Sequence, residues 1–405
     1  MLLFSSLRRA LAVFAIGSAL LAPSVFHAQA APAETKVVTP ALDFSGVFFG
    51  SVSYRSDSAT KLANGGKERS SFNIDRVYLT FRMPAGDDAS IRVTTDVFQQ
   101  SPSTYYAGWA IRLKYAYLQY NFLHDIGDMK GFNASVRVGL LHTVAIDHYE
   151  LFWMRYMEQT AIERNGFFSS SDAGIAAVVT LPGKLGELYA TVVNGAGYTS
   201  GETDRFKDLG IRFTLTPFGA SDGLFKTFAI SPWYSMGSTA STHQNDVASA
   251  TNNGPISDGL TKDRYGIMVG LRDRRLTFAV DYDKRTDSFE SGANTVASPL
   301  VKADTTGTVT AFFASVRPFE LADAKHKSPF GLFFRYDNFV PKDQSVAGVN
   351  ATAPSQQRTI AGVFWDLTSR ATFALDYQGL KFSNYTPAAQ PAEQSTLFLH
   401  WNILF

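Results

Sequence analysis

The last eleven residues, STLFLHWNILF (395–405), alternate between two kinds of side chain. Five large apolar residues at every second position from Leu397 to Phe405 share one face, and His400 and Asn402 lie on the other. A period of two predicts a strand with one apolar and one polar face. The same period is found in IRVTTDVF (91–98) and RLTFAVDYD (275–283).

The alternation extends along most of the chain and defines sixteen predicted strands. They span 43–55, 70–83, 89–98, 109–122, 132–142, 172–181, 186–194, 206–216, 225–237, 263–272, 275–285, 305–316, 329–339, 358–368, 371–380 and 394–405. Most are long enough to cross a bilayer as tilted strands, which takes about nine to eleven residues.

The connections between these segments alternate in length. Short ones lie at 84–88, 182–185, 217–224, 273–274 and 369–370, and long ones at 56–69, 143–171, 238–262, 286–304, 340–357 and 381–393. Two connections, 123–131 and 317–328, are longer than a tight turn. Short turns at one end and long loops at the other are typical of outer-membrane barrels.

A soluble β-sandwich would also show alternation, so other features must separate the two folds. The predicted strands exceed the usual five or six residues. Aromatic residues stand near strand ends, where the girdles of a membrane barrel belong, at Tyr115, Tyr117, Trp365, Tyr377 and Trp401. The final strand ends in Phe405, which resembles the aromatic C-terminal signature of bacterial outer-membrane barrels. That signature implies recognition by the barrel assembly machinery.

We therefore predict an all-β fold: a 16-stranded antiparallel transmembrane β-barrel with short periplasmic turns, long outer loops and an inward-folded third loop. Residues 31–405 would form this single domain. Residues 1–30 are predicted to be a signal peptide, because Arg8 and Arg9 precede an uncharged run and Ala28-Gln29-Ala30 gives a small-x-small site cut after Ala30. The predicted location is the bacterial outer membrane.

Composition excludes several classes of protein. The 405 residues include no cysteine, so disulfide scaffolds, thiolate zinc sites and cysteine nucleophiles are ruled out. A formal net charge of +1 argues against nucleic acid as a partner. No nucleophile signature is present, and we expect neither an enzyme nor a cofactor.

By the alternation of the connections, the segment 143–171 is the third outer loop, and its composition is unusual for an exposed loop. It contains TVAIDHYELFWMRYMEQTAIERNGFF, which is dense in aromatic and charged residues. Such a segment should be packed, and the available place is inside the barrel. Sixteen strands leave an aqueous lumen, which an inward loop would constrict. The predicted constriction residues are Asp147, His148, Glu150, Trp153, Arg155, Glu158, Glu163 and Arg164.

A sixteen-stranded barrel with an inward third loop resembles the general bacterial porins. Residues 136–177 resemble the phosphate-selective porin O and P family more specifically. The shared elements are Arg137 and Gly139, then Arg155, Met157 and Glu158, then Phe168, then Asp172 and Gly174. The resemblance implies a homotrimer of independent pores in outer-membrane lipid.

Strand parity supports a pore for small hydrophilic or anionic solutes. Strands two to eight carry seven inward basic residues and one inward acid, Asp96. The candidate pore-lining residues among them are Arg76, Arg92, Arg112, Lys114, Arg137 and Arg212. Rings of basic residues favour anions, and a basic wall opposite an acidic loop would set a transverse field. The lining has no long arginine ladder, so a mild anion preference, extending at most to phosphate, is expected.

Other interpretations stay open. The barrel could be a substrate-specific channel for sugars or aromatic acids, with Trp153 and Tyr156 stacking on the ligand. It could also be a surface adhesin displayed through its long loops, or an outer-membrane enzyme that uses His400. His142, Asp147, His148 and Glu150 lie close in sequence, but their spacing matches no helix-based zinc motif, and no metal site is expected.

Overall fold

The computed structural model describes residues 41–100, 108–126, 129–243, 245–249, 254, 259–343, 354–383 and 393–405. The predicted signal peptide and its cut after Ala30 lie outside these residues. Parts of the predicted loops 238–262, 340–357 and 381–393 also lie outside them.

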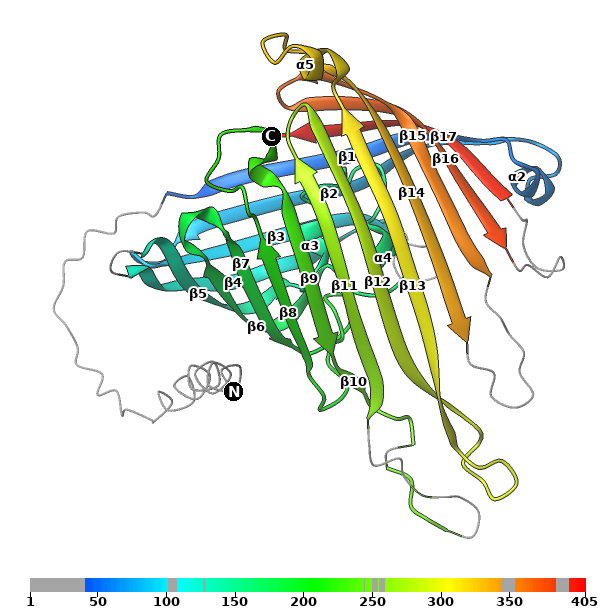
Figure 1. Ribbon diagram of the computed structural model, residues 1–405. Helices are drawn as coiled ribbons and strands as arrows, with labels where there is room; N and C mark the ends of the chain where they lie inside the picture. Colours follow the sequence, from blue (N-terminus) through cyan, green and yellow to red (C-terminus); the bar gives the residue numbers. More distant parts are fainter. Residues whose placement is uncertain are drawn as a thin grey trace. The chain divides into compact units, whose positions relative to one another are not determined.

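Seventeen strands form one antiparallel sheet that closes on itself (Figure 1). The closure pairs the first strand with the last, with Gly50 opposite Trp401. Strand β10 (Ser238–Thr239) has two residues and continues β9 along the same edge of β11. The barrel wall therefore has the sixteen strands predicted from the sequence.

The sixteen wall strands keep their sequence order around the barrel. They are β1 (Asp43–Arg55), β2 (Arg69–Pro84), β3 (Ala89–Gln100), β4 (Gly108–Ile126), β5 (Met129–His142), β6 (Ser171–Thr180), β7 (Gly186–Val193), β8 (Asp208–Leu215), β9 (Ala229–Met236), β11 (Leu260–Arg272), β12 (Leu276–Ser291), β13 (Val301–Val316), β14 (Phe330–Asp343), β15 (Ser355–Thr368), β16 (Ala371–Ser383) and β17 (Glu393–Leu404).

The described helices are short and lie in connections. They are α2 (Ser58–Ala63), α3 (Ile146–Tyr149), α4 (Ala161–Arg164), α5 (Pro318–Ala322) and the 3-10 turns η1 (Pro182–Lys184) and η2 (Leu224–Thr227). In the described part of the chain, no helix has the length and apolar character needed to cross a bilayer.

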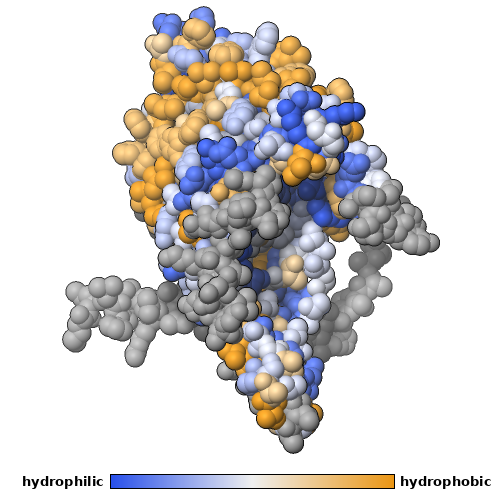
Figure 2. Space-filling view, turned by 90° about the vertical axis from the view of Figure 1, so that its right-hand side faces the viewer, coloured by the Kyte–Doolittle hydropathy of each residue, from blue (hydrophilic) through white to orange (hydrophobic). Residues whose placement is uncertain are grey.

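The wall strands turn apolar side chains outward. In β8, Leu209, Ile211 and Phe213 are 46%, 47% and 39% exposed, whereas Arg212 is buried. Figure 2 shows hydrophobic residues over much of the upper part of the visible face. This inside-out arrangement is expected where lipid covers the outer surface and water fills the inside.

Register shifts interrupt the alternation in β2, β4 and β15, and the one in the middle of β4 changes a prediction. Between β3 and β4 the register shifts, so that Thr94 pairs with Tyr115 and Thr95 with Leu113, leaving Lys114 as the extra residue of a β-bulge. The bulge reverses the parity of the rest of β4. Tyr115 and Tyr117 are consequently buried on the inner face. Their prediction as outward girdle residues is wrong for this reason, while Trp365 and Tyr377 are exposed as expected.

The third outer loop, L3 (residues 143–170), leaves β5 at His142 and returns into β6 at Ser171. It contains α3 and α4 and folds into the barrel. The strand ends on the other side are joined mainly by short turns, as between β2 and β3 or between β15 and β16. The inward third loop predicted from its composition is confirmed.

Candidate functional site

L3 is held against one half of the barrel wall by apolar packing. In two clusters, its buried apolar side chains pack against apolar residues on the inner faces of β9 and β11–β16. The loop contributes Val144, Ala145, Ile146, Tyr149, Phe152, Trp153, Met157, Ala161, Ile162 and Phe167 to these clusters. Burial of this much apolar surface is the main force that keeps the loop inside.

Buried hydrogen bonds fix the first turn of L3 to the wall. The Tyr149 hydroxyl donates to Asp283 Oδ1 at 2.8 Å and accepts from Trp233 Nε1 at 2.8 Å. His148 Nε2 lies 2.8 Å from Ser231 Oγ. Burial, together with nearby cations, places the pKa of His148 well below its usual value, so this imidazole is neutral at pH 7.

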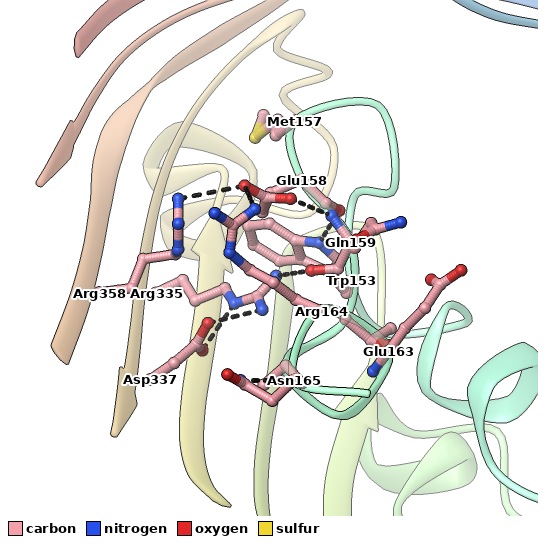
Figure 3. A network of polar contacts seen from close by, with 12 residues as sticks. Trp153, Met157, Glu158, Gln159, Glu163, Arg164, Asn165, Arg335, Asp337 and Arg358 are labelled. Carbon is pink, nitrogen blue, oxygen red and sulfur yellow. Dashed lines mark hydrogen bonds and ion pairs between the residues drawn. The ribbon is translucent and has the colours of Figure 1, made fainter. Parts of the chain in front are cut away.

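A network of ionic contacts fixes the middle of L3 (Figure 3). Glu158 Oε2 accepts from Arg358 of β15 at 3.1 Å and from Arg164 of the loop at 2.8 Å. Arg335 of β14 donates to the Gln159 carbonyl at 2.8 Å and pairs with Asp337 at 2.7 Å. These contacts place the segment 158–164 beside β14 and β15.

Trp153 lies beneath this network. Its indole Nε1 donates to the Glu158 carbonyl at 2.6 Å, and its ring packs against Phe313. The Arg335 guanidinium carbon lies 4.2 Å from the centre of the Trp153 ring, which is a cation–π contact. Trp153 is only 7% exposed, so its indole is occupied by loop and wall and is not free to stack on a solute.

Arg155 neutralises two more loop carboxylates. It forms ion pairs with Glu163 and, at 3.1 Å, with Glu150. Burial raises the pKa of Glu150, and Lys114 and Arg155 oppose that rise. Three of the four predicted loop acids are thus paired with arginines. The expected acidic face of the loop is absent at those three positions, because the pairing arginines come from the loop itself and from β15.

The fourth loop acid, Asp147, faces the opposite wall. Its side chain is 48% exposed and its Oδ1 lies 3.2 Å from His142 Nε2. His148 turns away toward Ser231, and Glu150 toward Arg155. The four residues considered as metal ligands are therefore divided between different contacts, and no group of three metal-binding side chains occurs among the described residues.

The wall opposite L3 carries two cations without a carboxylate partner. Arg92 donates to Thr94 Oγ1 at 3.2 Å and lies above the Tyr115 ring, 4.6 Å from its centre. Arg137 donates to Gln119 Oε1 at 2.9 Å and lies above the Tyr117 ring. Neither forms an ion pair with any carboxylate in the described ranges. Tyrosine rings and amide or hydroxyl oxygens contact both guanidinium groups, and Arg92 also lies 3.2 Å from His142 Nε2, while neither guanidinium contacts a carboxylate directly.

The remaining predicted basic residues differ in whether a carboxylate neutralises their charge. Arg76 and Arg112 both bind the buried Asp96, at 3.1 and 2.9 Å, so these three residues retain one net positive charge. Arg212 is buried and donates to the Val144 carbonyl and to Glu187. Lys114 is also buried, with its ammonium group 4.2 Å from the centre of the Tyr78 ring.

Sequence reasoning missed several anchors of L3, among them Arg358 and Gln378. Arg358 shares the parity of Asp366 on its strand, so alternation could have identified it as inward. Gln378 donates to the Met157 carbonyl at 3.2 Å. An uncharged wall residue that binds a loop backbone atom leaves no distinctive signal in a single sequence.

Among the cavities that L3 lines, two lie against different parts of the wall. One of about 580 Å³ is lined by Asp147, Leu151 and Phe152 of the loop and by the short-turn ends of β7, β8 and β11. The other, of about 490 Å³, is lined by residues 155–159 of the loop and by β1, β2, β16 and β17. The loop therefore lines two separate spaces within the barrel.

Comparison with known proteins shows what this architecture resembles. The sequence matches no protein family and no curated protein. Among solved structures, the anion-selective porin from Comamonas acidovorans superposes with a TM-score of 0.57 at 10% identity, covering 90% of this chain and 100% of that chain. The outer-membrane channel DcaP of Acinetobacter baumannii gives 0.57 at 13% identity, covering 90% and 97%.

The trimer form of OmpT, an outer-membrane protein of Vibrio cholerae, gives a TM-score of 0.53 at 11% identity and covers 90% of this chain and 99% of that chain. Likeness at such low identity shows the fold and leaves function to be argued from the site. The chain has the closed sixteen-stranded fold of these outer-membrane proteins.

Proposed function

We propose that this protein is an outer-membrane porin, a water-filled channel for passive diffusion of small hydrophilic solutes. The observation that carries this proposal is the one-sided packing of L3. The loop covers the apolar inner faces of β9 and β11–β16 and leaves the charged wall of β2–β5 facing the lumen. A narrowed, polar-lined barrel of this size conducts solutes without needing catalytic residues.

The lining supports a mild preference for anions. Arg92 and Arg137 keep their charge uncompensated, and the set formed by Arg76, Arg112 and Asp96 keeps one positive charge. Excess positive charge in a narrow pore raises the local concentration of anions. The resemblance of residues 136–177 to the phosphate-selective porin O and P family makes phosphate one candidate among these anions.

The same proposal covers location and assembly. The exposed apolar side chains of the wall fit outer-membrane lipid. The trimer form of OmpT supports a homotrimer here by analogy of fold.

Phe405 pairs the end of the last strand with the first strand by exchanging two backbone hydrogen bonds with Gly46. We infer that Phe405 is the residue recognised by the barrel assembly machinery. A cleaved signal peptide, residues 1–30, would deliver the chain.

Swelling of liposomes tests the channel itself. Refolded protein in lipid vesicles should admit small sugars and exclude larger ones, because L3 limits the diameter. Vesicles that contain refolded barrel but admit no solute of any size would contradict the porin proposal and favour the adhesin interpretation. Empty vesicles and vesicles with heat-denatured protein are the controls.

A further inference from the structure

The cavity of about 580 Å³ on the short-turn side of L3 has an unusual excess of positive charge. Five cationic side chains line it, against the two carboxylates of Asp147 and Glu187. The cations are Arg137, Lys184, Arg212, Lys226 and Arg272. With histidines counted as neutral, the excess is three positive charges.

Few of these charges are compensated. Glu187 pairs with Arg212 at 2.7 Å, and Asp147 lies against His142 at 3.2 Å. The other four cations form no ion pair with a carboxylate among the described residues. They come from β5, η1, η2 and the end of β11, so separate elements direct uncompensated charge into one space. Such convergence favours an anionic ligand.

Beside Asp147 and His148, the loop side of the same cavity also presents apolar side chains. Leu151 of L3 lines it and is 47% exposed, although the loop's other large apolar residues are mostly buried against the wall. Phe152 and Ala229 lie beside it in the lining. An apolar surface left in contact with water inside a polar lumen marks a place where an apolar group of a ligand would be favourably buried.

These two features together restrict the ligand. Inorganic phosphate has no apolar surface to place against Leu151. A neutral apolar molecule would leave the cations without a counter-charge. Sugars are typically bound through amides and carboxylates, and the described lining contains no Asn or Gln and only two carboxylates, both engaged.

We propose that this cavity binds organic carboxylates that carry an apolar body such as an aromatic ring, with the carboxylate toward the cations and the ring on Leu151. This inference rests on the proposed channel and names the solute class of that channel. The volume of about 580 Å³ is in the usual range of small-molecule sites, about 300–1,000 Å³.

Benzoate and acetate are the probes, since they share the carboxylate and differ in the ring. Binding is measured by calorimetry on the refolded full chain in detergent, and potassium chloride conductance is recorded in parallel. We expect benzoate to bind at least about tenfold more tightly than acetate, because the ring buries apolar surface. The Leu151→Asn variant should lose most of that difference, and Arg272→Gln should weaken both ligands.

Leu62→Asn is the matched control, because Leu62 is an 88% exposed leucine on α2 in the first long loop. It should leave the preference for benzoate unchanged. Equal binding of the two probes, or a preference that survives Leu151→Asn, would overturn the inference even if the protein conducts normally. Selective benzoate binding without any conductance would instead overturn the channel and keep the site.

Discussion

The Glu158 carboxylate on L3 accepts a hydrogen bond from the Arg358 guanidinium on β15 at 3.1 Å, across 200 residues of sequence. Both side chains are largely buried, at 14% and 9% exposure. Removing one partner of a buried ion pair costs about 3–5 kcal/mol where the other charge is left uncompensated, and less here because Arg164 still pairs with Glu158. This contact therefore holds the middle of the constriction loop against the wall.

Replacing Arg358 by Leu should loosen L3. Glu158 would retain Arg164, which comes from the loop itself and cannot tie the loop to the wall. We expect larger and noisier single-channel conductance, with a loss of roughly 3 kcal/mol of loop anchoring as the upper range. The control is Arg370→Leu, which removes an exposed arginine from the β15–β16 turn. Conductance identical to that of the parent protein would show that the pair does not hold the loop.

Acid should also loosen L3, because it protonates Glu158. Burial raises the pKa of this carboxyl, but Arg164 and Arg358 outweigh burial, so the net direction is below the ordinary value of 4.5. A lowered pKa means that the ionised carboxylate stabilises the packed loop above pH 4.5, and that this stabilisation is lost as the pH falls through the lower, folded-state value.

Current fluctuations recorded at decreasing pH check this effect. They should increase below pH 4.5 in the parent protein. Glu158→Gln should fluctuate at every pH and show no acid transition at that residue. A transition of unchanged size in the Gln variant would assign the acid response to another group.

Arg92 and Arg137 should set the anion preference. Each Arg→Gln change removes one uncompensated charge from the wall facing L3, and the double variant removes both. Reversal potentials under a salt gradient should move toward cations, more in the double variant than in either single one. Arg370→Gln removes the same charge from an exposed turn and should leave the reversal potential in place. Equal shifts of the reversal potential in all variants, Arg370→Gln included, would mean that the net charge of the protein sets ion selectivity and that the position of Arg92 and Arg137 does not.

Deleting residues 147–164 should open the lumen. The deletion removes α3 from Asp147 onward, α4 and the Glu158 network, and it leaves the wall strands intact. Single-channel conductance should rise. Deletion of α2, residues 58–63, is the comparison, because that helix buries none of its residues. A deletion variant that folds and conducts like the parent protein would place L3 away from the conducting path.

Much of the barrel can be predicted from sequence because each strand carries its own signal. The first strand, 43–55, has the predicted bounds. The ninth was predicted to begin at 225, but η2 (Leu224–Thr227) precedes it and the strand starts at Ala229. Local alternation does not show where a strand gives way to a tight turn.

The site is less accessible to sequence reasoning. The inward course of L3 follows from its apolar and aromatic content, which is a local property. Its anchors, such as Asp283 for Tyr149 and Arg358 for Glu158, are set by contacts more than a hundred residues apart. The β-bulge at Lys114 could not be predicted from the sequence either. It moves Tyr115 from the lipid face to a position beneath Arg92.

The most direct test of the account is single-channel recording of the refolded protein in a planar bilayer under a salt gradient. The account predicts stable conductance steps whose reversal potential has the sign of anion selectivity, because the wall facing L3 has uncompensated positive charge. A folded barrel that gives no steps, or steps with a cation-selective reversal potential, would contradict it.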